Sequence, residues 1–571
     1  MKINSKYLAI VAIIGLAISC KESFLDKAPI GQATEESLAN NQKGVESLII
    51  AAYSVVDGYS GWNAGENPWG SAASNWTYGS ICGGDAYKGS EPGDQPSITP
   101  LELHTVDPSN GYIASKWENV FDGIFRTNKA INAVKKVPGV TEDWRKQRLA
   151  ELQFLRGHYF FELKKVFNKV PYIDETVTEF RQPNDKDIWP NIEADLKAAA
   201  AVLPTTQSEL GRATKGSALA MLGKALIFQK KYADAKTAFD QVITSGVYKL
   251  TPKYDDNFNA ATRNNTEGVW VVQQAVNEGT DGDNGNIGDV LNFPYNGGPG
   301  ACCGFHQPSQ NLVNAYKVGA DGLPLLDTYN AANLKNDDGI NSDAAFTPAT
   351  DALDPRIDWT VGRRGIPYLD WGPHPGKAWI RSQIDAGPYS PKKLVYYKNQ
   401  QGTLSSASGW TSGYNANNVK LIRYSDVLLM AAECEVEVGS LEKARGYVND
   451  IRKRASNPDG FVKGADGKPA ANYVVNQYTA TWTDKALATK AVRFERRVEL
   501  GMEGHRFFDL VRWGIAAAEK TAYFAAESKI RPYLKNGIFT AGKSEYFPIP
   551  TNAVTLSSVG GKATLTQNPG Y

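Results

Sequence analysis

The sequence predicts a mainly α-helical fold, built on tetratricopeptide-like helical hairpins, with a large loop-rich insert and little β-structure. Residues 213–248 form two arms with helical apolar spacing on either side of the polar break Gln229-Lys230-Lys231. Their large and small positions follow the tetratricopeptide pattern, and a second copy covers residues 428–451, where Glu435 stands at an apolar position of the repeat. Because each hairpin buries its apolar face only against neighbours, other helices must complete the stack.

The N-terminus predicts an exported, lipid-anchored chain. Residues 1–19 place Lys2 and Lys6 before an apolar run that ends at Ile18. At about 1.5 Å per residue this run spans only about half of a bilayer core, so we interpret it as a signal peptide. Ser19-Cys20 resembles the end of a bacterial lipoprotein signal, which predicts lipidation of Cys20 and a tether over residues 20–42. The alternative is an ordinary secretory signal that happens to contain a cysteine.

Periodicity places the remaining helices in order along the chain. Residues 141–167 carry a helical apolar stripe, with Thr141 as the N-cap and acidic residues in the first turn. The other expected helices cover residues 43–59, 112–137, 187–203, 213–248, 420–455 and 484–518.

Two stretches lack helical periodicity and are rich in glycine and aromatic residues. One lies between Tyr59 and Tyr87, and its flat rings among small residues are typical of a binding loop. The other runs over residues 251–418, with β-like runs at 269–272 and 394–397. An insert this long predicts a loop-rich subdomain laid over the helical scaffold.

Composition excludes several classes of protein. The 571 residues contain 62 basic and 61 acidic side chains, so the net charge of +1 leaves no footprint for nucleic acid. The five cysteines form no CxxC pair and no Cys/His set with zinc spacing, so we expect no metal site. We interpret Cys434 as a core residue. The sequence does not decide whether Cys82 forms a disulfide with Cys302 or Cys303.

Candidate catalytic groups have structural interpretations. Glu503, His505 and Asp509 lack the spacing of a zinc helix, and the acids and arginines around them can pair with one another. The acidic loop at Asp281, Asp283 and Asn284 lacks the full EF-hand pattern, which favours a solvated turn. The five histidines form no nucleophile or metal constellation, and no cofactor motif is present. Paired carboxylates of a glycosidase stay an alternative, because they need only spatial proximity.

Aromatic residues with polar neighbours suggest a glycan site. A pyranose presents an apolar C–H face that stacks on a ring, while its hydroxyl groups bind carboxylates and amides. The candidates lie in the two glycine-rich stretches, and each ring could equally pack the loop core. They are Trp76, Tyr78, Asp85, Tyr87, Tyr295, Trp359 and Trp371.

Motifs along the whole mature chain resemble one family. They are Glu151–Phe161 with Val170-Pro171, the 213–248 hairpin, Ser309–Val313, Asp354–Arg356, Ile422–Leu429, Glu495–Leu500, Glu503–Gly514, Phe547–Pro550 and Gln567–Tyr571. In this order they resemble the SusD/RagB family of outer-membrane nutrient-binding lipoproteins. The resemblance implies a tetratricopeptide-like scaffold with a variable ligand face that caps a SusC-like TonB-dependent transporter and does no chemistry.

The resulting hypothesis is a surface-exposed lipoprotein that captures oligosaccharide and delivers it to that transporter, without a cofactor. Residues 43–571 form one SusD-like domain, divided into a helical half (43–250), a ligand-side insert (251–418) and a C-terminal helical half (419–571). Two rivals remain: a lipoprotein glycoside hydrolase, and a surface scaffold that binds peptide or protein. The sequence names neither the sugar nor its linkage.

Overall fold

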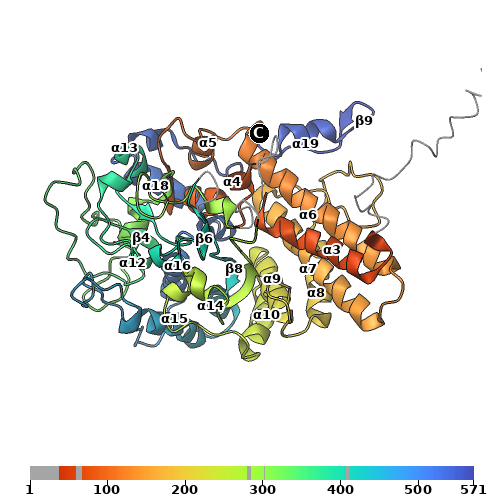
Figure 1. Ribbon diagram of the computed structural model, residues 1–571, viewed down its shortest axis with the longest axis horizontal. Helices are drawn as coiled ribbons and strands as arrows, with labels where there is room; N and C mark the ends of the chain where they lie inside the picture. Colours follow the sequence, from red (N-terminus) through yellow and green to blue (C-terminus); the bar gives the residue numbers. More distant parts are fainter. Residues whose placement is uncertain (1–37, 60–66, 280–284, 301, 407–410) are drawn as a thin grey trace, which may run out of the picture.

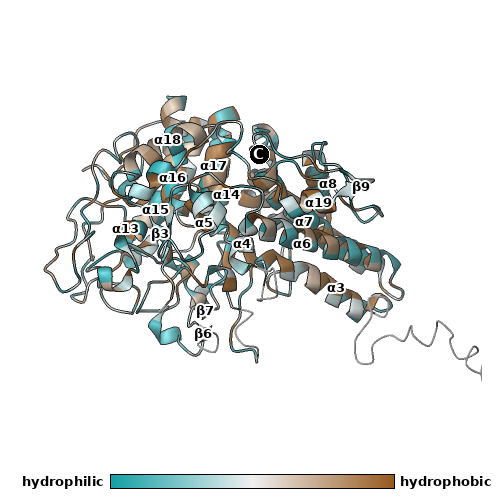
Figure 2. Ribbon diagram, turned by 90° about the horizontal axis from the view of Figure 1, so that it is seen from above, coloured by the Kyte–Doolittle hydropathy of each residue, from teal (hydrophilic) through white to brown (hydrophobic). Residues whose placement is uncertain are grey.

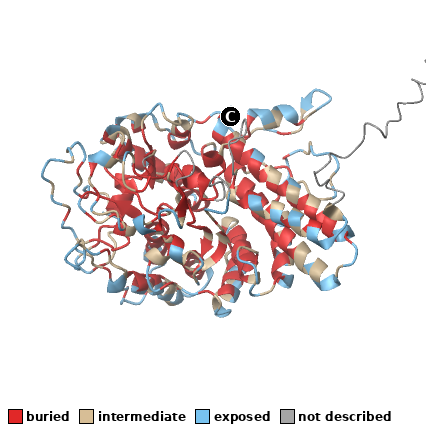
Figure 3. Cartoon of the chain, viewed as in Figure 1, coloured by how far each residue is buried: buried red, intermediate tan, exposed pale blue. Residues whose placement is uncertain are grey.

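The computed structural model describes residues 38–59, 67–279, 285–300, 302–406 and 411–571. The long helices between residues 42 and 202 (α3, α6, α7 and α8) gather at one end of the molecule, and the other end contains most of the loops and short elements together with the long helices between residues 424 and 500 (α14, α15 and α16; Figure 1). Buried residues run through both ends, and one large hydrophobic cluster contains side chains from Val45 to Leu565 (Figure 3). No described helix combines the length and apolarity that crossing a bilayer requires.

A continuous stack of antiparallel helices forms the scaffold. Each helix from α6 to α10 packs on the next, and α10 packs on α14, so the two predicted hairpins are neighbours in space. The stacked helices are α3 (Gln42–Ser54), α6 (Gly111–Lys136), α7 (Glu142–Phe167), α8 (Trp189–Val202), α9 (Lys215–Phe228), α10 (Tyr232–Thr244), α14 (Tyr424–Val438), α15 (Leu441–Ala455) and α16 (Lys485–Leu500). The predicted fold class is confirmed.

Local sequence explains the first hairpin. The hydroxyl of Thr214 accepts a hydrogen bond from the backbone N–H of Ser217 at 3.1 Å, which caps α9. A Cβ atom on Gly223 would lie 2.5 Å from the ring of Phe239, so the close approach of α9 and α10 requires glycine there. Thr141 caps α7 in the same way, as predicted.

Shorter elements surround the stack. The further helices are α4 (Pro68–Ser71), η3 (a π-helical turn, Trp76–Ile81), α5 (Ile98–Glu102), η6 (Ile287–Asp289), α11 (Gln310–Ala315), α12 (Ile357–Thr360), α13 (Gln383–Ala386), α17 (Arg506–Arg512), α18 (Ala516–Glu527) and α19 (Thr551–Leu556). Antiparallel strands pair as β1 (Ala86–Gly89) with β3 (Phe305–Pro308), β2 (Gly268–Val272) with β8 (Val419–Arg423), β4 (Val361–Gly362) with β5 (Ser390–Pro391), β6 (Ser405–Ser406) with β7 (Tyr414–Asn415), and β9 (Ser558–Val559) with β10 (Lys562–Ala563).

The β2/β8 pair closes the base of the insert. Gly268 pairs with Arg423 and Val272 pairs with Val419, so the two ends of the loop-rich stretch lie side by side. The prediction that a helix begins at residue 420 is therefore wrong, because this backbone is hydrogen-bonded to β2 instead. The expected run over residues 394–397 is likewise not a strand, whereas 269–272 is one.

The predicted helix over residues 484–518 is interrupted. The structure breaks it into α16, α17 and α18, and the first break falls between residues 500 and 506. Gly504 in that break has φ +75°, outside the helical region, and a Cβ atom there would lie 1.9 Å from the carbonyl oxygen of Ser74. Helical spacing continues through the break, so only the glycines mark it in the sequence.

Buried ion pairs fix the insert to the C-terminal helices. Arg423 at the end of β8 is fully buried, and it contacts Glu267 and Glu503 at 2.8 Å and also contacts Glu499. Arg454 on α15 holds Glu499 at 2.5 Å. Although burial alone would raise it, the pKa of Glu267 is lowered to about 2 because Arg454 and Arg423 favour the charged carboxylate. This network positions the loops above it.

Candidate functional site

Four of the predicted ligand residues lie inside the protein. Trp76 is fully buried, and its Nε1 donates to the carbonyl oxygen of Gly288 at 2.9 Å. The hydroxyl of Tyr78 lies 2.8 Å from the carbonyl oxygen of Tyr112. Tyr87 bonds Glu527, and Asp85 pairs with Arg497 at 3.3 Å.

The expectation that these four residues face a ligand is therefore corrected. The described part of this stretch folds into α4, η3 and β1, and the indole of Trp76 and the phenols of Tyr78 and Tyr87 find hydrogen-bond partners in the interior. A buried aromatic residue and a ligand-facing one give the same signal in the sequence, so the sequence alone could not distinguish them. None of the four enters the candidate site.

Trp359 makes its hydrogen bond to a residue outside the insert. It is half-buried, and its Nε1 donates to the carbonyl oxygen of Gly460 at 2.7 Å. The ammonium group of Lys392 lies 5.3 Å from its ring centroid. Trp359 therefore joins the insert to the turn after α15.

The other two predicted rings belong to one aromatic group in the insert. We call Tyr295, Trp371 and Trp379 the aromatic rim. All three are half-buried, and the backbone N–H of Tyr295 donates to the carbonyl oxygen of Trp379 at 2.9 Å. Trp371 packs edge-on against Tyr396 at 5.8 Å, and its Nε1 donates to the carbonyl oxygen of that residue at 3.1 Å.

Sequence reasoning missed Trp379. The signal was present, because Trp379 follows Trp371 in the same glycine- and proline-rich run. Tyr368 and His374 pack against its ring at 5.5 and 5.2 Å. Gly298 lies on the indole so closely that a Cβ atom there would be 2.7 Å from the ring. Its neighbours therefore lock Trp379 in place while part of it stays exposed, as a stacking platform requires.

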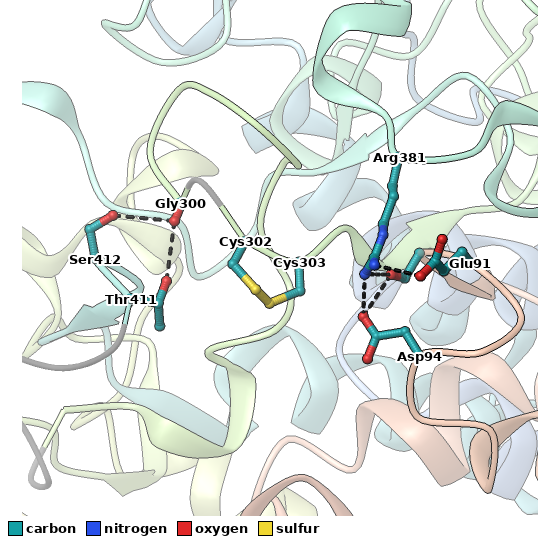
Figure 4. Close-up of a disulfide and its surroundings, with 9 residues drawn as sticks. Glu91, Asp94, Gly300, Cys302, Cys303, Arg381, Thr411 and Ser412 are labelled. Atoms are coloured by element: carbon teal, nitrogen blue, oxygen red, sulfur yellow. Dashed lines mark hydrogen bonds and ion pairs between the residues drawn. A yellow bond between two sulfur atoms is a disulfide. The ribbon is translucent and has the colours of Figure 1, made fainter.

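Polar groups converge beside the rim. The guanidinium of Arg381 lies 5.2 Å from the ring centroid of Tyr295. It contacts Asp94 at 2.6 Å, Glu91 at 2.5 Å and the hydroxyl of Ser90 at 3.1 Å (Figure 4). Arg381 and the two carboxylates keep 26 to 47% of their side-chain surface exposed. A fixed set of exposed donors and acceptors next to flat rings is suited to sugar hydroxyl groups.

A disulfide between adjacent residues, Cys302 and Cys303, lies beside this polar group (Figure 4). The next residue, Gly304, approaches Tyr295 so closely that a Cβ atom would lie 3.3 Å from the Cβ of the tyrosine. Cys82 and Cys434 are free and buried, so the bridge from Cys82 is not formed, and Cys434 is a core residue as expected. Burial raises the pKa of both free thiols.

The five histidines and the acids of the segment 503–509 are held within the fold. Burial lowers the pKa of His306 and His374 to about 3, and that of His158 and His505 to about 4. His104 is shifted in the same direction. Glu503 pairs with Arg423 and Lys393, and Asp509 with Arg496 and Arg512. Within the described ranges, no group of three or more His, Cys, Asp or Glu side chains is placed to hold a metal ion. Cys20 and the acidic loop at Asp281, Asp283 and Asn284 lie outside those ranges.

Two family models match the chain. The SusD family model covers residues 266–571, and a second model, described as starch-binding associating with outer membrane, covers residues 23–227. The chain belongs to the SusD family. The resemblance drawn from the sequence motifs is therefore confirmed.

Relatives and solved structures of the SusD family align over nearly the whole chain. The SusD-like protein P25 of Formosa agariphila is 22% identical, over 93% of this chain and 95% of its own length. A SusD superfamily protein from Bacteroides vulgatus superposes with a TM-score of 0.66 at 20% identity, covering 92% of this chain and 98% of its own.

Two similar structures are named for a glycan. A laminarin-binding SusD-like protein has a TM-score of 0.60 at 22% identity, covering 93% of this chain and 100% of its own. Surface glycan-binding protein A from Bacteroides thetaiotaomicron, in complex with laminarihexaose, has a TM-score of 0.63 at 19% identity, with coverage of 93% and 100%. At these identities the likeness establishes the shared fold.

Proposed function

We propose that this SusD-family chain captures oligosaccharide at the cell surface and delivers it to a SusC-like TonB-dependent transporter, without turning the ligand over. The observation that carries the proposal is the aromatic rim with Arg381, Glu91 and Asp94 beside it. Relatives named for glycan binding support the ligand class. The outer-membrane association in the description of the N-terminal family model supports the location. Lipidation of Cys20, the transporter partnership and the division at residues 250 and 418 belong to the same proposal.

A glycan-array screen followed by calorimetry tests the binding. We expect at least one glycan to bind. For that glycan, Trp371→Ala and Trp379→Ala should each weaken affinity about tenfold, equivalent to ~1.4 kcal/mol, because each removes an aromatic contact with the ligand. Trp144→Ala is the matched control, because Trp144 is also half-buried but lies on α7, where it donates to Glu46 at 3.0 Å. A blank array, or equal losses in all three variants, would contradict the assignment.

Two further measurements test the remaining parts. In the first, the protein is incubated with labelled oligosaccharide, and the appearance of shorter labelled products would favour the hydrolase alternative. In the bacterium, a radiolabelled fatty acid should be incorporated into the wild-type chain and not into a Cys20→Ala variant. Labelling of both would refute the lipid anchor at this residue.

A further inference from the structure

A cavity separate from the candidate site is lined by none of the residues of the aromatic rim. It is a groove of 630 Å³ between α6, the segment 171–182 and α19. We call it the α6/α19 groove. Its apolar lining includes Phe121, Phe125, Phe180, Ala553, Leu556 and Leu565.

Several large apolar side chains that line the groove are exposed to solvent. Leu556 keeps 73% of its surface accessible, Phe180 keeps 65% and Phe125 keeps 56%. None of the residues of α19 is buried, and this short helix stands beside α6 at the helical end of the molecule (Figures 1 and 3). A contiguous exposed apolar surface with a polar border is typical of a docking site.

A segment of this chain has the composition that the groove requires. The described chain begins at Leu38, and the apolar residues of the preceding tether are clustered over residues 24–30 (FLDKAPI). Residues 31–37 (GQATEES) are polar apart from one alanine. Arg181 and Glu118 at the border of the groove carry charges opposite to those of Asp26 and Lys27, respectively.

The tether also has the reach. It leads into α3, which packs on α6, the helix that forms one wall of the groove. The residues between Leu25 and Leu38 span up to about 43 Å when extended, at ~3.3 Å per residue. The whole of α6, with 26 residues, is about 39 Å long. Leu25 can therefore reach along the length of α6, whereas Ile30, eight residues before Leu38, reaches about 26 Å.

The match to the N-terminal family model indicates that residues 24–30 do more than act as a spacer. The N-terminal family model begins to match at residue 23, fifteen positions before the described fold begins, and so includes residues 24–30. A spacer that only holds a domain off a membrane has no reason to follow a sequence pattern, since flexible linkers need only length and polarity.

We propose that residues 24–30 dock in the α6/α19 groove, with Phe24 and Leu25 against the apolar lining. The docked segment begins at Phe24, four positions after Cys20. If that cysteine carries lipid, as the proposed function states, the α6/α19 end faces the membrane. Most of the insert lies toward the other end of the long axis (Figure 1). Docking itself does not depend on lipidation.

Disulfide crosslinking in the full chain tests the contact. Leu25→Cys is combined with Leu556→Cys in the groove, or with Ile384→Cys on α13 as the control, since Ile384 is also exposed, at 65%, and lies in the insert. On mild oxidation the groove pair should crosslink at least about tenfold faster than the control pair, because docking raises the effective concentration of the two thiols. Equal rates would overturn the proposal.

Hydrogen exchange supplies an independent readout. Amides in segments 173–182 and 551–565 should exchange about tenfold faster in a Phe24→Asp/Leu25→Asp variant than in wild type. A Gln32→Asp/Thr34→Asp variant adds the same charge at polar tether positions and should match wild type. Unchanged exchange in the first variant would refute docking. Protection that depends on protein concentration, or that arises only when the transporter is added, would assign the groove to a second copy or to the transporter instead.

Discussion

Replacing Arg423 with methionine should destabilise the fold without touching the candidate site. Methionine keeps an unbranched side chain and removes the charge, so Glu267, Glu499 and Glu503 lose a partner that is itself fully buried. Breaking a buried ion pair on one side costs about 3–5 kcal/mol, because the remaining charge stays buried without compensation. With an unfolding entropy of about 2.1 cal/mol/K per residue over 571 residues, this loss lowers Tm by about 3–4 °C.

Differential scanning calorimetry measures the shift. Lys490→Met is the matched control, because the pair of Lys490 with Asp327 is 55% and 69% exposed and should change Tm by less than about 1 °C. If Arg423→Met shifts Tm no more than this control, the network does not stabilise the fold as argued.

The pH dependence of this shift has a defined sign. The pKa of Glu499 and of Glu503 is lowered in the fold, so their contribution to wild-type stability is present above the unfolded pKa of about 4.5 and is lost as pH falls below it. In the variant, Arg454 still contacts Glu499 and Lys393 still contacts Glu503, but the loss of Arg423 raises the pKa of both carboxyl groups. Their protonation then relieves the excess of buried negative charge. The Tm difference should therefore narrow between pH 7 and pH 4. A difference that widens would contradict the account.

Three further predictions concern single positions. Gly79→Ala places a Cβ atom 1.8 Å from the carbonyl oxygen of Gly504 and should cost about 3 kcal/mol, whereas Gly111→Ala, with open space around it, should be neutral in the same urea titration. Thr214→Ala removes the α9 cap and should cost about 1–2 kcal/mol; a change below a few tenths would refute the capping role. In a protein that begins after Cys20, thiol reagent should label neither Cys82 nor Cys434 until urea unfolds the chain, because both thiols are buried; labelling of the native protein would contradict their placement.

The helical scaffold could be predicted because its signal is local. Helical spacing, the Thr141 and Thr214 caps and the small residues of the hairpins all act within a few turns, and α6, α7, α9 and α10 begin and end within a few residues of the expected positions. Predictions failed where a partner far along the chain decides the structure. Residues 420–423 join β2, about 150 residues earlier in the sequence, and Gly504 ends a helical pattern because Ser74 lies against it.

The candidate site shows the same limit at the level of side chains. Composition located the aromatic stretches, yet it gave Trp76 and Trp371 equal weight. The indole N–H of Trp76 donates to the carbonyl oxygen of Gly288, more than two hundred residues away, and the ring is fully buried. The indole N–H of Trp371 donates to the carbonyl oxygen of Tyr396 within the insert, and the ring is half-buried. Inward or outward direction thus depends on non-local hydrogen-bond partners, which a single sequence does not record.

The ion-pair network has a consequence for how ligand recognition is distributed. It joins the parts of the chain through Lys224 to Asp426 at 3.3 Å, Asp85 to Arg497 at 3.3 Å, and Lys393 of the insert to Glu503 at 2.6 Å. Moving the base of the insert would expose or unpair several buried charges at once, which is strongly unfavourable. The base is therefore held in one position, and a binding surface carried on it is organised before the ligand arrives. Affinity and selectivity must then depend on the outermost groups, Tyr295, Trp371, Trp379 and Arg381, whose replacement should alter binding.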